Sequence, residues 1–172
     1  MHESPEQIAE LQALLDRTFA RMNPHMARIV KPDRRLSARQ IATYLQGIRH
    51  VAFATVNASG EPRVAPLDGL FVRGRFHVST GGEAARLAHL ARQPRCSLTH
   101  FAGDDVAVTV NGTAVVLERD HPDVPALAPV YRDAYGSVPF DWGERVVIVR
   151  VEPTSMWSYS FRPEHYPEVP EG

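Results

Sequence analysis

Short runs of β-branched and aromatic residues, separated by turn signals, dominate the chain from residue 50 onwards. This pattern predicts many short strands joined by tight turns, with few helices between them. It is typical of a small β-barrel and not of alternating parallel strand–helix units. The strands are expected at residues 50–56, 61–68, 70–72, 75–79, 95–101, 105–117, 145–151 and 154–161. The first of them is apolar throughout, which predicts burial on both faces.

Two features of the predicted strands indicate irregular backbone. Pro62 and Pro66 lie within the second strand and cannot donate to a sheet ladder, so this strand needs an unpaired side, a bulge or an edge position. We expect an interruption at residues 63–66 that leaves main-chain groups free for a ligand. The dipeptide Asn111-Gly112 lies in the middle of the longest predicted strand and indicates a bulge or a sharp bend.

Helical periodicity is confined to the start of the chain and to short connections. Residues 5–22 carry apolar side chains at helical spacing behind Ser4, which can cap the helix. Ser37 can cap a second helix at 38–46, and the basic stretch 28–35 between the two is predicted to be a loop. This connection is too long for a helix-turn-helix. Shorter helices are expected at residues 83–92 and 130–135.

The size and composition are those of one ordinary soluble domain. The chain has 172 residues, of which 44% are hydrophobic and 23% charged. A net charge of −1 and a pI near 6.7 give no basis for binding nucleic acid or an anionic membrane. No apolar run is long enough to span a bilayer, and the acidic start of the sequence does not resemble a signal peptide. We therefore expect a cytoplasmic protein.

Cysteine and histidine usage excludes two kinds of site. Cys96 is the single cysteine, so an intrachain disulfide is impossible, and its place in a predicted strand favours inert packing. The eight histidines lack the spacing and the Cys or acidic companions of a metal site, so no metal is expected.

The end of the fourth predicted strand carries the best candidate for ligand chemistry. Ser79 and Thr80 close that strand, two glycines follow, and Arg86 comes one turn into the next helix. Main-chain N–H groups at a helix start, small hydroxyls and a guanidinium together suit a phosphate group. The alternative interpretation is an ordinary strand end followed by a solvated helix face. Only one of the basic residues is a lysine, so a buried anion would depend on arginine, hydroxyls or backbone.

Six segments follow one another in an order that resembles a known family: 52–56, 60–66, 76–80, 86–90, 94–98 and 110–114. They are similar to the split-barrel flavin-binding proteins, the pyridoxamine 5'-phosphate oxidase-like and deazaflavin-dependent reductases. The resemblance implies a mainly β fold, a six-stranded antiparallel split barrel with peripheral helices. It also implies a homodimer with one cofactor in each of two clefts at the subunit interface. The expected parts are a helical extension at 1–47 that packs on the barrel, the barrel at 48–161 and a polar, loosely ordered tail at 162–172.

The resemblance also implies which residues bind the cofactor. Main-chain groups of the second strand would run along the tricyclic ring, and the end of the fourth strand and the next helix would hold the phosphate. A tryptophan of the last strand, from the same or the second subunit, would approach the ring or line the substrate side. These residues are Arg63, Val64, Ala65, Pro66, Val78, Ser79, Thr80, Arg86 and Trp157. No side chain stands out as a general acid or base.

The sequence departs from the family pattern at the phosphate end. Family members often carry a basic pair before the short helix, with lysine second; here Arg86 takes the second position and Ala84 the first. His89 stands where asparagine is usual. One phosphate contact is therefore missing, or a donor comes from elsewhere, such as Arg34, Arg35 or Arg75. The residues that recognise pyridoxal phosphate in true oxidases have no counterpart, so that substrate is not assigned.

These features predict a flavin-dependent oxidoreductase that transfers a hydride between bound FMN and a small conjugated substrate. FMN is the first choice because the phosphate set is compact. An 8-hydroxy-5-deazaflavin coenzyme is the alternative, because its acidic tail would suit a basic loop formed by Lys31, Arg34, Arg35 and Arg39. A non-catalytic flavin- or haem-binding protein on the same barrel is the third possibility.

Overall fold

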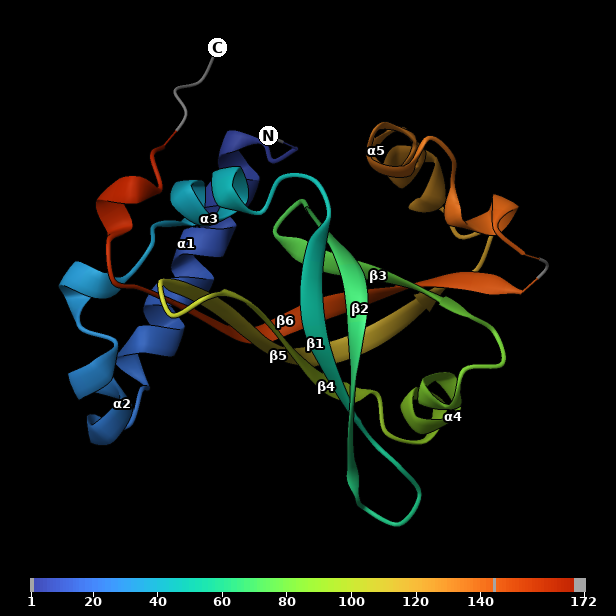
Figure 1. Cartoon of the computed structure of the whole chain (residues 1–172), viewed down its shortest axis with the longest axis horizontal. Coiled ribbons are helices and arrows are strands. Elements are labelled where there is room, and N and C mark those ends of the chain that lie inside the picture. Colours follow the sequence, from blue (N-terminus) through green and yellow to red (C-terminus); the bar gives the residue numbers. More distant parts are fainter. Residues whose placement is uncertain (1, 144, 169–172) are drawn as a thin grey trace.

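The computed structural model of the chain describes residues 2–143 and 145–168. Six strands close into one barrel in the order β1-β2-β3-β6-β5-β4, and all neighbouring pairs are antiparallel (Figure 1). The predicted six-stranded antiparallel barrel is therefore confirmed. The strands are β1 (Arg49–Val56), β2 (Pro62–Val72), β3 (Arg75–Gly81), β4 (Arg95–Ala102), β5 (Val106–Leu117) and β6 (Val146–Ser160).

The strand β2 is continuous, so the predicted interruption at residues 63–66 is wrong. It pairs with β1 in one unbroken register up to Gly69. Its other edge pairs with β3 only from there to Val72. Pro62 and Pro66 therefore lie on a stretch with one unpaired edge, as their missing N–H groups require. The prediction of an unpaired edge is confirmed, and a regular strand provides it.

The two longest strands, β5 and β6, are bent where they pair. Their register shifts between Asn111 and Gly112, which confirms the predicted bulge. A side chain at Gly112 would bring its Cβ to 2.2 Å from the Glu152 carbonyl oxygen, so only glycine allows this close approach. The last two predicted strands are a single one, because Pro153 pairs at the bulge, where a missing N–H is tolerated.

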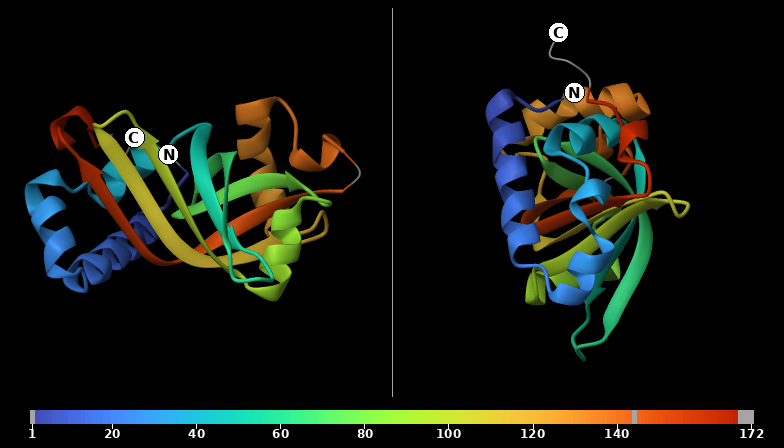
Figure 2. Two further views of the ribbon diagram at one scale, coloured as in Figure 1. Left: turned by 60° about the horizontal axis from the view of Figure 1, so that its bottom comes forward. Right: turned by 90° about the vertical axis from the view of Figure 1, so that its left-hand side faces the viewer.

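Three helices from the start of the chain pack along one side of the barrel (Figures 1 and 2). They are α1 (Pro5–Ala20), α2 (Pro24–Ile29) and α3 (Ala38–Tyr44), with a short 3₁₀ turn η1 (Pro32–Arg34) between the last two. Ser4 and Ser37 form capping boxes at α1 and α3, as their positions predict. The helix α2 was not predicted. Asn23 accepts a hydrogen bond from the Met26 N–H and starts it.

The main core joins these helices to the interior of the barrel. Leu15 of α1 and Ile41 of α3 are fully buried in the same cluster as Phe53, Val78 and Val149 of the strands. In β1, buried positions alternate with half-buried ones. The prediction of burial on both faces is therefore right for one face of the strand and wrong for the other. The helical segment and the barrel thus share one hydrophobic core.

A smaller core lies on the outer face of the barrel, under α5 (Val124–Tyr135). Leu127 and Tyr131 of this helix pack on Leu70 and Ile148 of the strands. The helix starts earlier than the predicted 130–135, because a proline in its first turn loses no hydrogen bond there. The turn η2 (Pro139–Asp141) follows it.

The remaining helix, α4 (Ala85–Arg92), connects β3 to β4 and begins two residues later than predicted. The tail is better ordered than its composition indicates. It forms the turn η3 (Pro163–His165), and Tyr166 donates a hydrogen bond of 2.8 Å to Asp105. The end of the predicted tail, residues 169–172, lies outside the described residues. Among the residues that are described, no helix is long and apolar enough to cross a membrane.

Candidate functional site

A cleft of about 360 Å³ lies between β1, β2 and α4. The β1–β2 hairpin projects from the barrel at this point, with α4 beside it (Figure 1). Four of the nine residues predicted to bind a cofactor line the cleft, namely Arg63, Val64, Ala65 and Arg86. Segments from three elements of the chain therefore meet at one concave surface.

The β2 wall of the cleft offers main-chain groups at a free edge. Alternate residues of a strand direct their N–H and C=O groups to the same edge. Pro62 and Pro66 have no N–H, so β1 pairs through the residues between them, and the Val64 N–H is left on the unpaired edge. The Val64 side chain is 69% exposed. This edge is therefore able to hydrogen-bond the polar rim of a planar ligand.

The α4 wall of the cleft supplies a positive charge. Arg86 is the second residue of the helix rather than one turn into it, and its guanidinium donates a hydrogen bond to the Thr80 hydroxyl. Thr80 is only 6% exposed and therefore held in place, so its hydrogen bond fixes the position of the Arg86 guanidinium. Ala84 caps the helix without a side-chain hydrogen bond, which leaves the first main-chain N–H groups for another acceptor. The guanidinium and the helix start together favour an anion.

The other predicted phosphate ligands do not join this pair. Ser79 and Thr80 point to opposite faces of β3, because successive residues of a strand alternate. The Ser79 hydroxyl donates to the Tyr131 hydroxyl at 3.2 Å, under α5. Val78 is fully buried in the barrel core. The sequence suggested that both hydroxyls bind one phosphate. In this protomer they lie on opposite faces of β3, and only Thr80 contacts Arg86.

Gly81 and Gly82 lie at the end of β3, and the structure explains the need for glycine at one of the two positions. A Cβ on Gly82 would lie 2.5 Å from the Arg145 carbonyl oxygen, whereas Gly81 has no atom within 4 Å of that position. Gly82 is therefore required by the packing of its loop against the start of β6. Only Gly81 leaves open space.

The remaining predicted contributors lie elsewhere in the protomer. Pro66 lies on β2 beyond the cleft lining, and Trp157 lines a separate hollow beside α1 and α2. The arginines proposed as substitute donors are engaged within the chain. Arg34 donates to Tyr159, Arg35 to the Val30 carbonyl, and Arg75 to Glu152. None of the three lines the cleft, whose arginines are Arg63 and Arg86.

Sequence reasoning missed most of the cleft floor. Phe53 and Thr55 come from β1, where they lie on the same face two residues apart, and Thr55 Oγ1 is 2.9 Å from His89 Nδ1. Asn57 and Ala85 complete the lining. The period-2 pattern of β1 was a usable signal for Phe53 and Thr55. That His89 meets them depends on the packing of α4, which no local pattern encodes.

Other chemistry finds little support in the part of the chain that the structure describes. No group of three or more His, Cys, Asp or Glu side chains is placed to hold a metal ion there. Cys96 is buried in the core, and burial raises the pKa of its thiol to about 11, so it is inert packing, as expected.

Comparisons with known proteins agree with this architecture. Residues 37–158 match the protein family described as pyridoxamine 5'-phosphate oxidase. A search of curated proteins gives no match. Among solved structures, a conserved hypothetical protein of Mycobacterium tuberculosis has a TM-score of 0.66 at 21% identity, covering 83% of this chain and 96% of that one.

Two further structures carry names that refer to redox cofactors. An FAD-binding protein of Mesorhizobium loti has a TM-score of 0.56 at 19% identity, covering 73% of this chain and 93% of that one. A protein named F420 reductase has a TM-score of 0.51 at 19% identity, covering 65% of this chain and 91% of that one. At these identities the likeness is one of fold. Together with the family match over residues 37–158, it shows that the chain belongs to the pyridoxamine 5'-phosphate oxidase-like family of split-barrel proteins.

Proposed function

We propose that this protein is a flavin-dependent oxidoreductase that binds FMN in the cleft between β1, β2 and α4. The observation that carries the proposal is that Arg86, held by the buried Thr80 hydroxyl, lines the same cleft as a stretch of β2 with an unpaired edge. The pair offers charge-assisted donors to a phosphate, and the edge offers main-chain groups to the ring. When bound, a flavin supplies the hydride chemistry, and the substrate is a small conjugated molecule.

The residues of the cleft would then bind and orient the cofactor and shield it from water. The Val64 N–H would donate to the polar rim of the ring, where donors stabilise charge that develops on reduction. Phe53 gives the cleft an apolar floor and is 1% exposed. The hydrogen bond between Thr55 and His89 holds the imidazole in place at the same cleft. Ala84 and Ser79 supply no donor, so the anion would rest on Arg86, Thr80 and the helix start.

We further propose that the active form is a homodimer with the cofactor at the interface. The residues of β2 up to Asp68 are exposed or half-buried, and one edge of this stretch is unpaired. A strand edge in this state favours pairing with another chain. A second subunit would cover the edge and complete the cleft. Sedimentation velocity of the purified protein tests this directly, and a monomer at micromolar concentration would contradict it.

The central experiment titrates the purified protein with FMN and with the 8-hydroxy-5-deazaflavin coenzyme F420, followed by fluorescence. Replacing Arg86 with alanine removes a charge-assisted hydrogen bond and should weaken binding about tenfold or more. Arg92→Ala, on the exposed last turn of the same helix, is the matched control and should leave the affinity unchanged. If neither cofactor binds the parent protein, or Arg86→Ala leaves both affinities unaltered, the proposal fails.

The same titration separates the alternatives. The structural likeness to an F420 reductase supports the deazaflavin as the second candidate. Against it, Arg34 and Arg35 of the basic loop are engaged by Tyr159 and Val30 in this protomer. Uptake of the deazaflavin alone would reverse the ranking. A bound flavin or haem that neither nicotinamide cofactors nor dithionite reduce would indicate a non-catalytic binding protein.

A further inference from the structure

A second cavity, of about 320 Å³, lies at the opposite end of β2 from the cleft. Its walls come from the starts of α1, α5 and β3, the end of β2 and the middle of β6. The side chains at Arg63 and Arg73 are separated by nearly the whole length of β2, which is on the order of 30 Å. The cavity is therefore distinct from the candidate cofactor site, and it is large enough for a small organic molecule.

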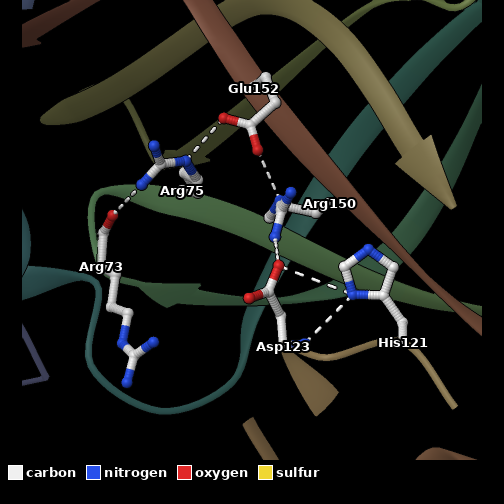
Figure 3. A network of polar contacts seen from close by, with 6 residues as sticks. All are labelled: Arg73, Arg75, His121, Asp123, Arg150 and Glu152. Carbon is white, nitrogen blue, oxygen red and sulfur yellow. Dashed lines mark hydrogen bonds and ion pairs between the residues drawn. The ribbon is translucent and has the colours of Figure 1, made fainter. Parts of the chain in front are cut away.

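Two ion-paired arginines form the wall of this cavity on β3 and β6 (Figure 3). Arg75 Nε donates to Glu152 Oε2 at 2.7 Å. Arg150 donates to Asp123, and its Nε lies 2.5 Å from the second oxygen of Glu152. The two carboxylates are thereby balanced by two guanidinium groups. The ion pairs also keep the carboxylates charged: Arg150 lowers the pKa of Asp123, and for Glu152 burial is outweighed by Arg75 and Arg150, so its pKa is lowered too.

One positive charge at the cavity is left over. Arg73 lines the cavity, and its side chain forms no ion pair with any residue in the described part of the chain. Figure 3 shows its guanidinium set apart from the paired ones. Its charge still acts on Asp123, since it contributes to the lowering of that pKa. The cavity therefore carries a net charge of one positive unit, which suits a small monoanion.

One ring nitrogen of a buried imidazole in the same wall also lacks a hydrogen-bond partner. His77 is 3% exposed, lies opposite Arg150 in the β3–β6 register, and its Nδ1 finds no hydrogen bond within residues 2–143 and 145–168. Burial, aided by the charge of Arg150, lowers the pKa of His77 to about 3, so the ring is neutral at pH 7. A buried polar atom without a partner costs stability unless a ligand or a water satisfies it. A network built only to fasten α5 would need neither this atom nor the extra arginine.

We propose that this cavity is a second binding site, which takes a small organic monoanion with one carboxylate and at least one hydroxyl group. Arg73 pairs with the carboxylate, and His77 Nδ1 exchanges a hydrogen bond with the ligand. Asp123 and Glu152 accept hydrogen bonds only, so a ligand that also carries hydroxyl donors matches the lining better than a plain carboxylate.

The test uses glycerate, which carries a carboxylate and two hydroxyls, and propionate, which has the same carbon chain without them. The full chain is titrated while the His77 ring resonances are followed by NMR, assigned by comparison with His77→Gln. Glycerate should give a saturable shift, and propionate should bind roughly tenfold more weakly, because it offers no hydroxyl donor to the carboxylates of the lining. Equal binding of the two, or no saturable shift with either, overturns the proposal.

Arg73→Gln is the variant that tests the charge, since the Arg73 side chain is exposed and forms no ion pair with the described residues. It should weaken glycerate binding about tenfold, whereas Arg145→Gln, at a distant exposed position, should not. Stronger binding of inorganic phosphate than of glycerate would also contradict the assignment. Because FMN affinity is measured separately through Arg86, failure at one site is distinguishable from failure at the other.

Discussion

The two halves of β2 show how one strand serves two purposes. From Gly69 to Val72 the strand is paired with β3 and fully buried, with α5 covering its outer face. From Pro62 to Asp68 it is paired on one edge only and remains exposed or half-buried. The same backbone conformation is thus a structural wall in one half and an open surface in the other.

This difference identifies where ligand binding energy is available. In the covered half, the side chains are buried against the rest of the chain, so substitution there should affect folding. In the open half, the main-chain groups on the edge away from β1 pair with no described strand, and the Val64 side chain is exposed. Substitution there should therefore affect binding and assembly. The candidate cofactor cleft lies beside the open half.

The largest expected effect comes from comparing a buried side chain of the covered half with an exposed one of the open half. Phe71 is 1% exposed and its ring lies 5.0 Å from that of Phe76. Phe71→Ala should lower the free energy of unfolding by about 3–5 kcal/mol, through lost burial and a cavity. Val64→Ala, in the open half, should change it by less than about 0.5 kcal/mol. Urea unfolding of both variants measures this, and equal losses would break the distinction between the halves.

The next effect concerns the loop that places α4 beside the open half. Gly82→Ala would force a Cβ against the Arg145 carbonyl oxygen, at 2.5 Å, and should cost about 1–3 kcal/mol of stability. Gly81→Ala meets no atom within 4 Å and serves as the matched control. Thermal unfolding of the pair tests the packing argument. A larger loss at Gly81 would indicate that the loop adopts another arrangement.

The free energy of unfolding should depend on pH through His77, which lines the cavity at the covered end of β2. Its pKa is about 3 in the folded chain and 6.5 as the ordinary value, so between these limits the unfolded chain binds a proton that the folded chain does not. Stability should therefore fall as the pH is lowered through this window, by up to about 1.4 kcal/mol per pH unit.

The measurement is the difference in stability between the parent and His77→Gln from pH 7 to 5, where the paired Asp123 and Glu152 stay ionised. The variant should show the shallower dependence. Identical slopes would mean that His77 binds protons equally well in the folded and the unfolded chain, which would contradict a buried, neutral ring.

The smallest expected effect separates the two hydroxyls at the end of β3. Thr80 contacts Arg86 at the cleft, whereas Ser79 contacts Tyr131 under α5. Thr80→Val should weaken FMN binding several-fold, by about 1 kcal/mol, because Arg86 loses the group that fixes it. Ser79→Ala should leave the affinity unchanged. The reverse order would show that the sequence-based assignment of Ser79 is right and that the strand presents its other face to the cofactor.

The sequence was most informative where a local rule has only one solution. Prolines four residues apart required an unpaired edge, Asn111-Gly112 required a bulge, and serines before apolar repeats fixed the starts of α1 and α3. It was least informative at element ends, where β2 and β6 each continued through a proline that suggested a break. Sheet pairing across the chain stabilised those strands beyond their local propensity.

What the sequence alone determined is the class of fold and the list of chemical groups: a small β-barrel, an arginine near a helix start and a free strand edge. Which groups act together was decided by tertiary structure. The side-chain period of a strand sends Ser79 and Thr80 to opposite faces, and only the closure of the barrel and the docking of α4 and α5 fix which face meets Arg86 and which meets Tyr131. Neighbours in sequence can therefore belong to different sites, because distance in the fold is set by packing and not by chain order.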